Sequence, residues 1–217
     1  DLYSEYMVHM NLELPGMPPD GEGVLIDPYW ALTAAQVAIE IENGHMVTVD
    51  GKNTQVDSVY LHPDWDDGAS HDIALIKLSE PMKLAKSAEL YSLNDETGQL
   101  VVVAGRGDTG NGNIGPTHND GQLRAATNRV DGVDDLFIYW EFDDPEEEVR
   151  VQVLEGISGP GDSGGPAFLE RGGRTYVAGI SSSQSTSQTN GEPGMYGVVE
   201  YYVRVSSYLT WIYGIIE

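Results

Sequence analysis

The sequence predicts an all-β protein, folded as a sandwich or a barrel, and three observations support this prediction. Asn-Gly or Asp-Gly pairs occur eight times, and both pairs tolerate the positive φ angles of tight hairpins. The segments between these pairs hold short runs of β-branched and other apolar residues, and helix signals are scarce. Many short strands joined by Gly-rich turns are typical of sandwiches and barrels.

The clearest strand candidates are runs in which β-forming residues follow one another without a break. They are residues 46–49, 73–78, 100–103 and 175–180. We expect two helices, a short one within 33–42 and a better one at the C-terminal end, where a serine N-cap precedes an apolar stripe. The stretch 83–98 is polar and has no strong periodicity, so we expect it to link two halves.

Composition limits the functions that the chain can have. Its 217 residues suit one compact unit or two small, tightly packed ones. A formal net charge of -24 repels phosphate backbones and anionic lipids, so we expect no nucleic-acid or membrane partner. The acidity either serves solubility in a salty medium or attracts cations and basic partners. The absence of cysteine excludes a disulfide framework, a thiolate metal site and a cysteine nucleophile.

The strongest chemical signal is the run Gly-Asp-Ser-Gly-Gly-Pro at residues 161–166, with the serine at Ser163. A nucleophilic serine needs an exposed hydroxyl and backbone N–H groups directed at the developing oxyanion. Glycines on both sides allow a sharp turn and a close approach of the substrate. The alternative is a Gly-rich hairpin with an incidental serine, and the hexapeptide as a whole argues against it.

Two further segments carry a resemblance to a known family. Residues 71–78, His-Asp-Ile-Ala-Leu-Ile-Lys-Leu, place Asp72 directly before an apolar strand, where a buried carboxylate needs a hydrogen-bond donor. On its own, this would be an ordinary aspartate between a loop and a strand. Residues 30–37 read Trp-Ala-Leu-Thr-Ala-Ala-Gln-Val. Together with the run around Ser163, in this order and spacing, they resemble the trypsin (chymotrypsin-like) family of serine proteases, in a bacterial-type form without disulfides.

The resemblance extends over most of the chain, from about Tyr6 onward. His62-Pro63 resembles a pair that precedes the aspartate in many relatives, Pro-Gly-Met-Tyr at 193–196 resembles the strand beside the specificity pocket, and 206–212 resembles the C-terminal helix. The family fold is all-β, with two packed six-stranded antiparallel β-barrels and a C-terminal helix. For a single domain spanning 1–217, the resemblance implies barrels at about 1–90 and 98–204 and a helix at about 206–216.

Carried over residue by residue, the resemblance implies a catalytic site. Ser163 would be the nucleophile and Asp72 the orienting carboxylate. The N–H groups of Gly161 and Ser163 would form the oxyanion hole, and Ser182 would donate a hydrogen bond to Asp72.

The resemblance also implies a specificity pocket. Ile157 would form its base, and Gln184 and Gly194 would form its walls. An apolar base offers no countercharge to Lys or Arg, so we expect an uncharged, apolar side chain before the scissile bond.

The sequence departs from the family at the general base, because Gln36 stands where family members carry the catalytic histidine. Imidazole exchanges a proton near neutral pH, whereas a carboxamide does not titrate. Gln36 can still hydrogen-bond Ser163 and Asp72, so we expect the shape of the site to survive while kcat falls by a factor on the order of 10⁶. We do not expect rescue by any of the five histidines, which are His9, His45, His62, His71 and His118.

A second departure concerns activation. Family members are activated when a free amino terminus, usually Ile-Val-Gly-Gly, pairs with the aspartate beside the serine, here Asp162. No such segment follows Asp1, so we expect Asp162 to lack its charged partner and its loop to rearrange or stay mobile, as in a zymogen. Alternatively, the segment lies upstream of Asp1.

Three functions remain open: a pseudoprotease that binds peptides or a protein partner, an endopeptidase inactivated by a His-to-Gln change, and a hydrolase with an unconventional base.

We expect no cofactor and no metal. The acidic run 143–148 and the loop 107–121 are weak calcium candidates that fit solvated loops better. We expect a monomer that acts on or binds polypeptides. Family resemblance suggests that it is secreted or periplasmic, although no signal peptide opens the sequence.

Overall fold

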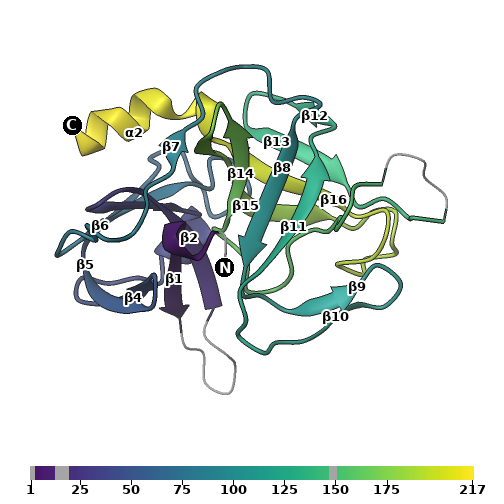
Figure 1. The fold of residues 1–217 in the computed structure, drawn as a ribbon, viewed down its shortest axis with the longest axis horizontal. Helices are drawn as coiled ribbons and strands as arrows, with labels where there is room; N and C mark the ends of the chain where they lie inside the picture. Colours follow the sequence, from purple (N-terminus) through teal and green to yellow (C-terminus); the bar gives the residue numbers. More distant parts are fainter. Residues whose placement is uncertain (1–2, 13–19, 147–150) are drawn as a thin grey trace.

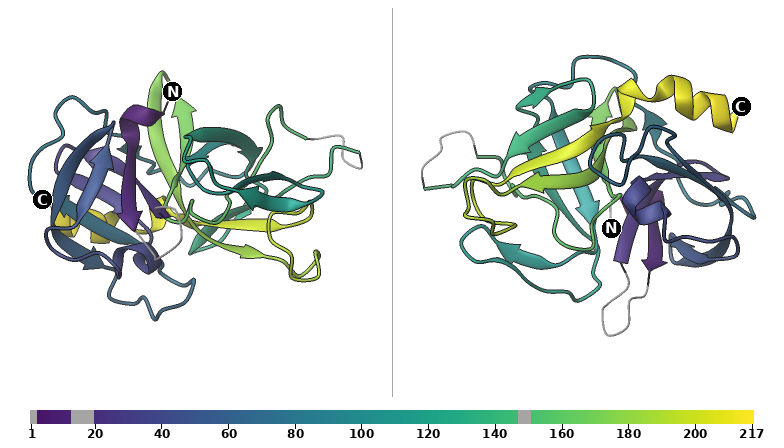
Figure 2. Two further views of the ribbon diagram at one scale, coloured as in Figure 1. Left: turned by 90° about the horizontal axis from the view of Figure 1, so that it is seen from below. Right: turned by 180° about the vertical axis from the view of Figure 1, so that it is seen from behind.

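A computed structural model describes residues 3–12, 20–146 and 151–217. The fold is mostly β, with two strand-built halves side by side and a short helix at the C-terminal end (Figures 1 and 2). The predicted all-β class and the C-terminal helix are therefore confirmed. Of the helices that the structure describes, none is both long and apolar enough to cross a bilayer.

The first half is a closed barrel, here called the first barrel, in the strand order β1-β2-β3-β6-β5-β4. Antiparallel pairing closes the ring, since β1 bonds both to β2 and to β4. A predicted helix within 33–42 is reduced to one short turn after β3. The elements of this half are η1 (Ser4–Tyr6), β1 (Met7–Leu12), β2 (Asp20–Asp27), β3 (Trp30–Thr33), α1 (Ala35–Ala38), β4 (Met46–Val49), β5 (Lys52–Leu61) and β6 (Ala74–Leu78).

The second half is a curled sheet, here called the second sheet, in the order β11-β8-β14-β15-β16-β13-β12. Its strands are β7 (Glu89–Leu90), β8 (Leu100–Gly105), β11 (Arg124–Arg129), β12 (Gly132–Val133), β13 (Phe137–Glu141), β14 (Pro166–Arg171), β15 (Arg174–Ser185) and β16 (Val199–Arg204). It has eight strands rather than six, because the two-residue strands β7 and β12 are added to the sheet and β7 pairs in parallel with β15. A separate hairpin of β9 (Thr109–Asn111) and β10 (Gly115–His118) projects from it (Figure 1).

A continuous apolar core joins the two halves. One buried cluster fills the first barrel and includes Phe168 of the second sheet, against which the ring of Tyr3 stacks at 4.6 Å. The chain returns to the first barrel through η2 (Val205–Ser207) and α2 (Leu209–Ile216), so that Tyr208 and Ile212 are buried in the same cluster (Figure 1). A second cluster around Trp140 and Tyr202 fills the second sheet.

Replacing Ile212 by Ala should destabilise the fold by about 2–5 kcal/mol, because a fully buried Ile leaves a cavity that the surrounding core only partly closes. Tyr213→Ala is the matched control, since Tyr213 is 42% exposed on the next position of the same helix. Urea unfolding of both variants measures the difference. Equal losses in the two variants would show that α2 does not anchor the C-terminal end on the first barrel.

Candidate active site

The predicted catalytic positions come from both halves and meet at their junction. Gln36 lies in α1, directly after β3, and Asp72 lies two residues before β6, so the first barrel supplies both. Ser163 lies in the loop that enters β14 of the second sheet. Gln36 and Ser163 line the same groove, of about 850 Å³, which runs over the first barrel.

Asp72 is a fully buried carboxylate that accepts hydrogen bonds from both halves of the molecule. Its Oδ1 accepts the backbone N–H of Gln36 at 2.8 Å. Its Oδ2 accepts the Gln36 Nε2 at 2.6 Å and the Ser182 hydroxyl at 2.7 Å. Burial raises the pKa of Asp72, and these donors offset part of that rise. The donors thus favour the ionised form of Asp72, and no cation pairs with it among the described residues.

Both N–H groups of the Gln36 side-chain amide are hydrogen-bonded in this arrangement. The second hydrogen of Nε2 goes to the backbone carbonyl of Ser182, at 2.8 Å. Both partners are acceptors, so the nitrogen must face them and only the amide oxygen remains for other contacts. Of the two bonds that the sequence allows Gln36, the one to Asp72 is formed, and among the described residues the other hydrogen of the amide goes to Ser182 and not to Ser163.

The loop around Ser163 presents two backbone donors. Within the described residues, neither the N–H of Gly161 nor that of Ser163 bonds to a backbone acceptor. The loop is fixed by other bonds, from the Glu22 N–H to the Ser163 carbonyl and from the Gly164 N–H to the Ser181 carbonyl, both at 2.9 Å. N–H groups without a backbone acceptor meet one requirement of an oxyanion hole.

Gly164 shows why this loop needs glycine. Its φ is +82°, and a Cβ there would lie 2.2 Å from Thr33 Oγ1 and 2.3 Å from the Glu22 carbonyl oxygen. Any side chain would therefore push the Ser163 loop away from the first barrel.

The carboxylate of Asp162 lies in a cradle of backbone donors. Its carboxylate accepts the N–H groups of Gly107 at 2.6 Å and Gly159 at 2.9 Å. A Cβ at Gly105 would lie 2.0 Å from Asp162 Oδ1, so only glycine leaves room for this carboxylate. Burial raises the pKa of Asp162 to about 6, and the two N–H donors partly oppose the rise. No cation pairs with Asp162 among the described residues, yet its oxygens are not left without donors.

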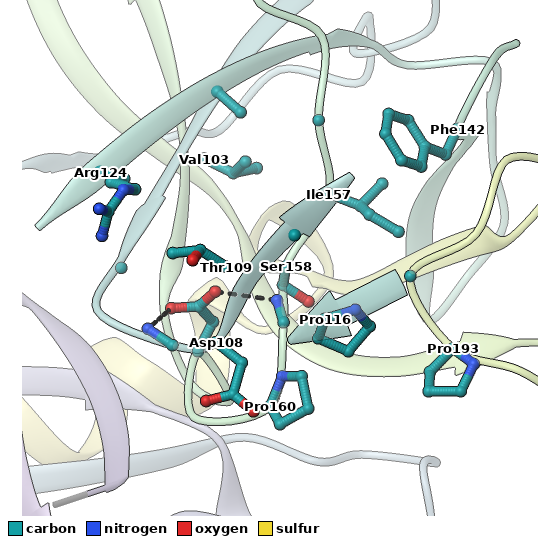
Figure 3. A pocket seen from close by; sticks show the side chains of 18 of the residues that line it. Val103, Asp108, Thr109, Pro116, Arg124, Phe142, Ile157, Ser158, Pro160 and Pro193 are labelled. Atoms are coloured by element: carbon teal, nitrogen blue, oxygen red, sulfur yellow. Dashed lines mark hydrogen bonds between the residues drawn. The ribbon is translucent and has the colours of Figure 1, made fainter. Parts of the chain in front are cut away.

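The predicted pocket residues Ile157, Gln184 and Gly194 line one cavity of about 330 Å³. Figure 3 shows Ile157 pointing toward Phe142, with Pro116 and Pro193 at one end of the cavity. Ser182 does not line this cavity and belongs to the hydrogen-bond network of Asp72.

The strand beside this cavity is β16 and not the segment 193–196, which the resemblance suggested. Residues 193–196 form turns and bends, and Gly194 packs on Pro116 there. The antiparallel register of β15 and β16 instead places Glu200 directly opposite Gln184.

Glu200 is a functional candidate that the sequence analysis missed. It is fully buried, and its carboxylate accepts the hydroxyl of Ser158 and the Nε2 of Gln184, the latter at 2.8 Å. Burial raises the pKa of Glu200 to about 8, although both donors favour the charged form. The available signal was a single acid inside the apolar and aromatic run Val199–Arg204.

One group of side chains could hold a metal ion. Potential ligand atoms of His62, Asp64 and His71 all lie within 4.8 Å of one another, and the two imidazole rings stack at 5.1 Å. Of the two calcium candidates, 107–121 contains the β9–β10 hairpin, and the end of 143–148 lies outside the described residues.

The fold, in which one half supplies Asp72 and the other supplies Ser163, defines the class as a chymotrypsin-like serine protease scaffold. The model of the trypsin family matches residues 4–212, so the chain belongs to the trypsin family.

Individual relatives are distant. The chain is 28% identical to trypsin from Squalus acanthias, over 88% of this chain and 83% of that protein. It is 28% identical to chymotrypsin-like elastase family member 1 from Canis lupus familiaris, over 89% of this chain and 80% of that protein. It is 24% identical to complement C1s subcomponent from Sus scrofa, where the match covers 89% of this chain and 32% of the relative. The chain thus spans about a third of the length of the complement relatives that it matches.

The raised pKa values of Glu200 and Asp162 predict that stability falls as the pH rises. The pKa of Glu200 moves from 4.5 to about 8 on folding, and that of Asp162 moves from 3.8 to about 6. Between about pH 4.5 and 8 the folded chain therefore holds more protons than the unfolded chain, and its free energy of unfolding declines. Glu200→Gln removes the pH-dependent contribution of Glu200 to the free energy of unfolding. The stability of this variant relative to wild type should therefore improve from pH 5 to pH 8.

Urea unfolding at both pH values, in enough salt to screen the net charge, measures this difference. Parallel pH profiles for wild type and Glu200→Gln would show that Glu200 titrates alike in the folded and unfolded states.

Proposed function

We propose that this chain is a serine endopeptidase scaffold that has lost most of its activity because Gln36 occupies the position of the general base. In this proposal Ser163 is the nucleophile, Asp72 holds the base in place, and the N–H groups of Gly161 and Ser163 bind the oxyanion. The observation that carries the proposal is the bonding of Gln36, whose amide nitrogen is fully used by Asp72 and the Ser182 carbonyl.

The chemistry explains the loss of activity. Attack by Ser163 on a peptide carbonyl requires that its hydroxyl proton be taken up and later delivered to the leaving amine. Gln36 can offer only an amide oxygen, which does not titrate near neutral pH. Catalysis should then rest on the oxyanion donors and on substrate binding alone, which leaves a small residual rate.

Among the described residues, no histidine is hydrogen-bonded to Ser163 or to Asp72. His45 lines the groove with Ser163, but its Nε2 lies 2.6 Å from the Met10 carbonyl, so this nitrogen must carry a proton. His71 contacts the hydroxyl of Tyr208, and His9 lies 3.3 Å from Glu22. His62 stacks on His71, and His118 contacts Thr109 and Thr117.

A natural pseudoprotease is the second candidate. Asp72 and the amide nitrogen of Gln36 have their hydrogen-bond partners without a substrate, which supports a site that keeps its shape while it only binds. Such a protein would bind peptides or a protein partner in the groove that Ser163 lines and in the cavity lined by Ile157, without cutting them. For either function we propose a bacterial-type, disulfide-free monomer that is secreted or periplasmic and needs no cofactor.

Gln36→His should restore the reactivity of Ser163. We expect the variant to react with a fluorophosphonate probe and to cleave casein at rates roughly 10³-fold or more above those of the wild-type chain, because the missing proton acceptor is returned. Gln36→His combined with Ser163→Ala is the matched control and should remain unlabelled.

Two results would contradict this proposal. Labelling of wild-type Ser163, with casein cleavage at the rate of Gln36→His, would show that Gln36 does not limit the reaction. Failure of the folded Gln36→His variant to react would show that the oxyanion donors are also ineffective, and the pseudoprotease would then be the better description.

A further inference from the structure

Two histidines and an aspartate converge at the neck of the loop between β5 and β6. His62 follows β5 directly and His71 lies just before β6, and the His62 N–H donates to the Ile73 carbonyl at 3.1 Å. The two imidazole rings stack across this neck, with centroids 5.1 Å apart and planes 9° from parallel. One ligand atom each from His62, Asp64 and His71 lies within 4.8 Å of the other two. The neck therefore directs three metal-binding side chains into one small volume.

These three side chains converge without satisfying one another. Among the described ion pairs, none joins the Asp64 carboxylate to either imidazole. The described hydrogen bond between them runs from the backbone N–H of Asp64 to His62 Nδ1, at 3.3 Å, and leaves the carboxylate out. Zinc holds such ligands at about 2.0–2.2 Å, which places them roughly 3.4 Å apart in a tetrahedron. An ion between the three groups would thus give each of them a partner after side-chain shifts of about 1 Å.

The C-terminal segment holds both rings in place. The Tyr208 hydroxyl lies 3.1 Å from His71 Nδ1, and Tyr208 is buried. The His62 ring packs against Trp211 of α2, with centroids 5.0 Å apart. Partners of this kind fix the orientation of metal-binding imidazoles. Asp64 is exposed and can rotate onto an ion that the two rings hold.

The donor set selects the kind of ion. Imidazole nitrogens suit zinc and the neighbouring transition metals, whereas Ca²⁺ takes six to eight oxygen ligands and Mg²⁺ keeps several waters. Two histidines and one carboxylate are among the sets that bind zinc with a water in the fourth position. The net charge of -24 also draws cations to the surface of the molecule.

We propose that His62, Asp64 and His71 bind one divalent metal ion of the zinc type, with water completing its coordination. The ion ties the two arms of the loop neck together. Asp72 follows His71 directly, so binding stabilises the segment that carries this carboxylate. This departs from the expectation of no metal, because His62 and His71 are distant in sequence and meet only through the pairing of β5 with β6. The ion takes no part in the proposed reaction.

Calorimetric titration of the chelator-treated intact chain with Zn²⁺ tests the proposal, in an excess of Ca²⁺ that occupies weak sites on the acidic surface. We expect one Zn²⁺ per chain. Asp64→Asn should weaken zinc binding at least tenfold, since even the loss of a group behind the ligands typically costs 10- to 100-fold. Asp66→Asn is the matched control and should bind like wild type, because Asp66 is an exposed acid on the same loop.

Two histidine variants keep the local structure while they remove a ligand. His71→Asn should also bind zinc at least tenfold more weakly, and asparagine tolerates the φ of +56° at this position. His62→Phe keeps a ring against Trp211 and should lose affinity to a similar extent. Zn²⁺ should raise the Tm of wild type and Asp66→Asn by more than that of the three ligand variants, because the ion binds the folded chain.

Three results would overturn the site: no zinc binding to wild type, displacement of Zn²⁺ by Ca²⁺, or unchanged zinc affinity in Asp64→Asn and the folded histidine variants. The stacked rings would then serve only to pack the loop against the C-terminal segment. None of these measurements requires catalysis, so the outcome does not depend on the reactivity of Ser163.

Discussion

Asp72 is a fully buried carboxylate at the junction of the two halves, and the active-site region depends on how its oxygens are held. The first barrel supplies two donors from Gln36, and the second sheet supplies the hydroxyl of Ser182. An unpaired carboxylate in this position would destabilise the fold, so the donors fix the relative placement of the halves as well as the side chains. Because a glutamine amide satisfies Asp72 as a donor, this junction does not require a histidine at position 36.

The other fully buried acids, all glutamates, and the partly buried Asp162 separate into two kinds. Glu22 and Glu96 are paired with arginines and belong to the framework. Asp162 and Glu200 are held only by neutral donors, and both lie beside the cavity that adjoins the Ser163 loop. In a chain with a net charge of -24, the two carboxylates that have no paired cation thus lie beside the cavity that a ligand would enter.

Local sequence was informative where local chemistry determines the structure. Asn-Gly and Asp-Gly pairs predicted a β fold, the Gly-rich run predicted the tight loop at Ser163, and the apolar run after Asp72 predicted β6. The sequence was misleading where the pairing of separate strands decides which side chains meet. The register of β15 against β16 shifts between Ser181 and Ser183, and only this pairing brings Glu200 opposite Gln184. A lone glutamate in a strand is otherwise expected to face solvent. The sequence alone also could not show which partners the Gln36 amide takes, because the Ser182 carbonyl that accepts one of its hydrogens comes from the other half.

The pH dependence of acylation by a p-nitrophenyl ester tests most directly whether the site lacks only its base. With Gln36 in place, the acylation rate should rise in proportion to hydroxide and show no plateau near neutral pH, since among the described residues no titratable side chain is hydrogen-bonded to the Ser163 hydroxyl. Gln36→His should instead give a sigmoidal profile with a midpoint near the ordinary histidine pKa of about 6.5. A sigmoidal profile with a neutral midpoint in the wild-type chain would reveal another base and contradict the role assigned to Gln36.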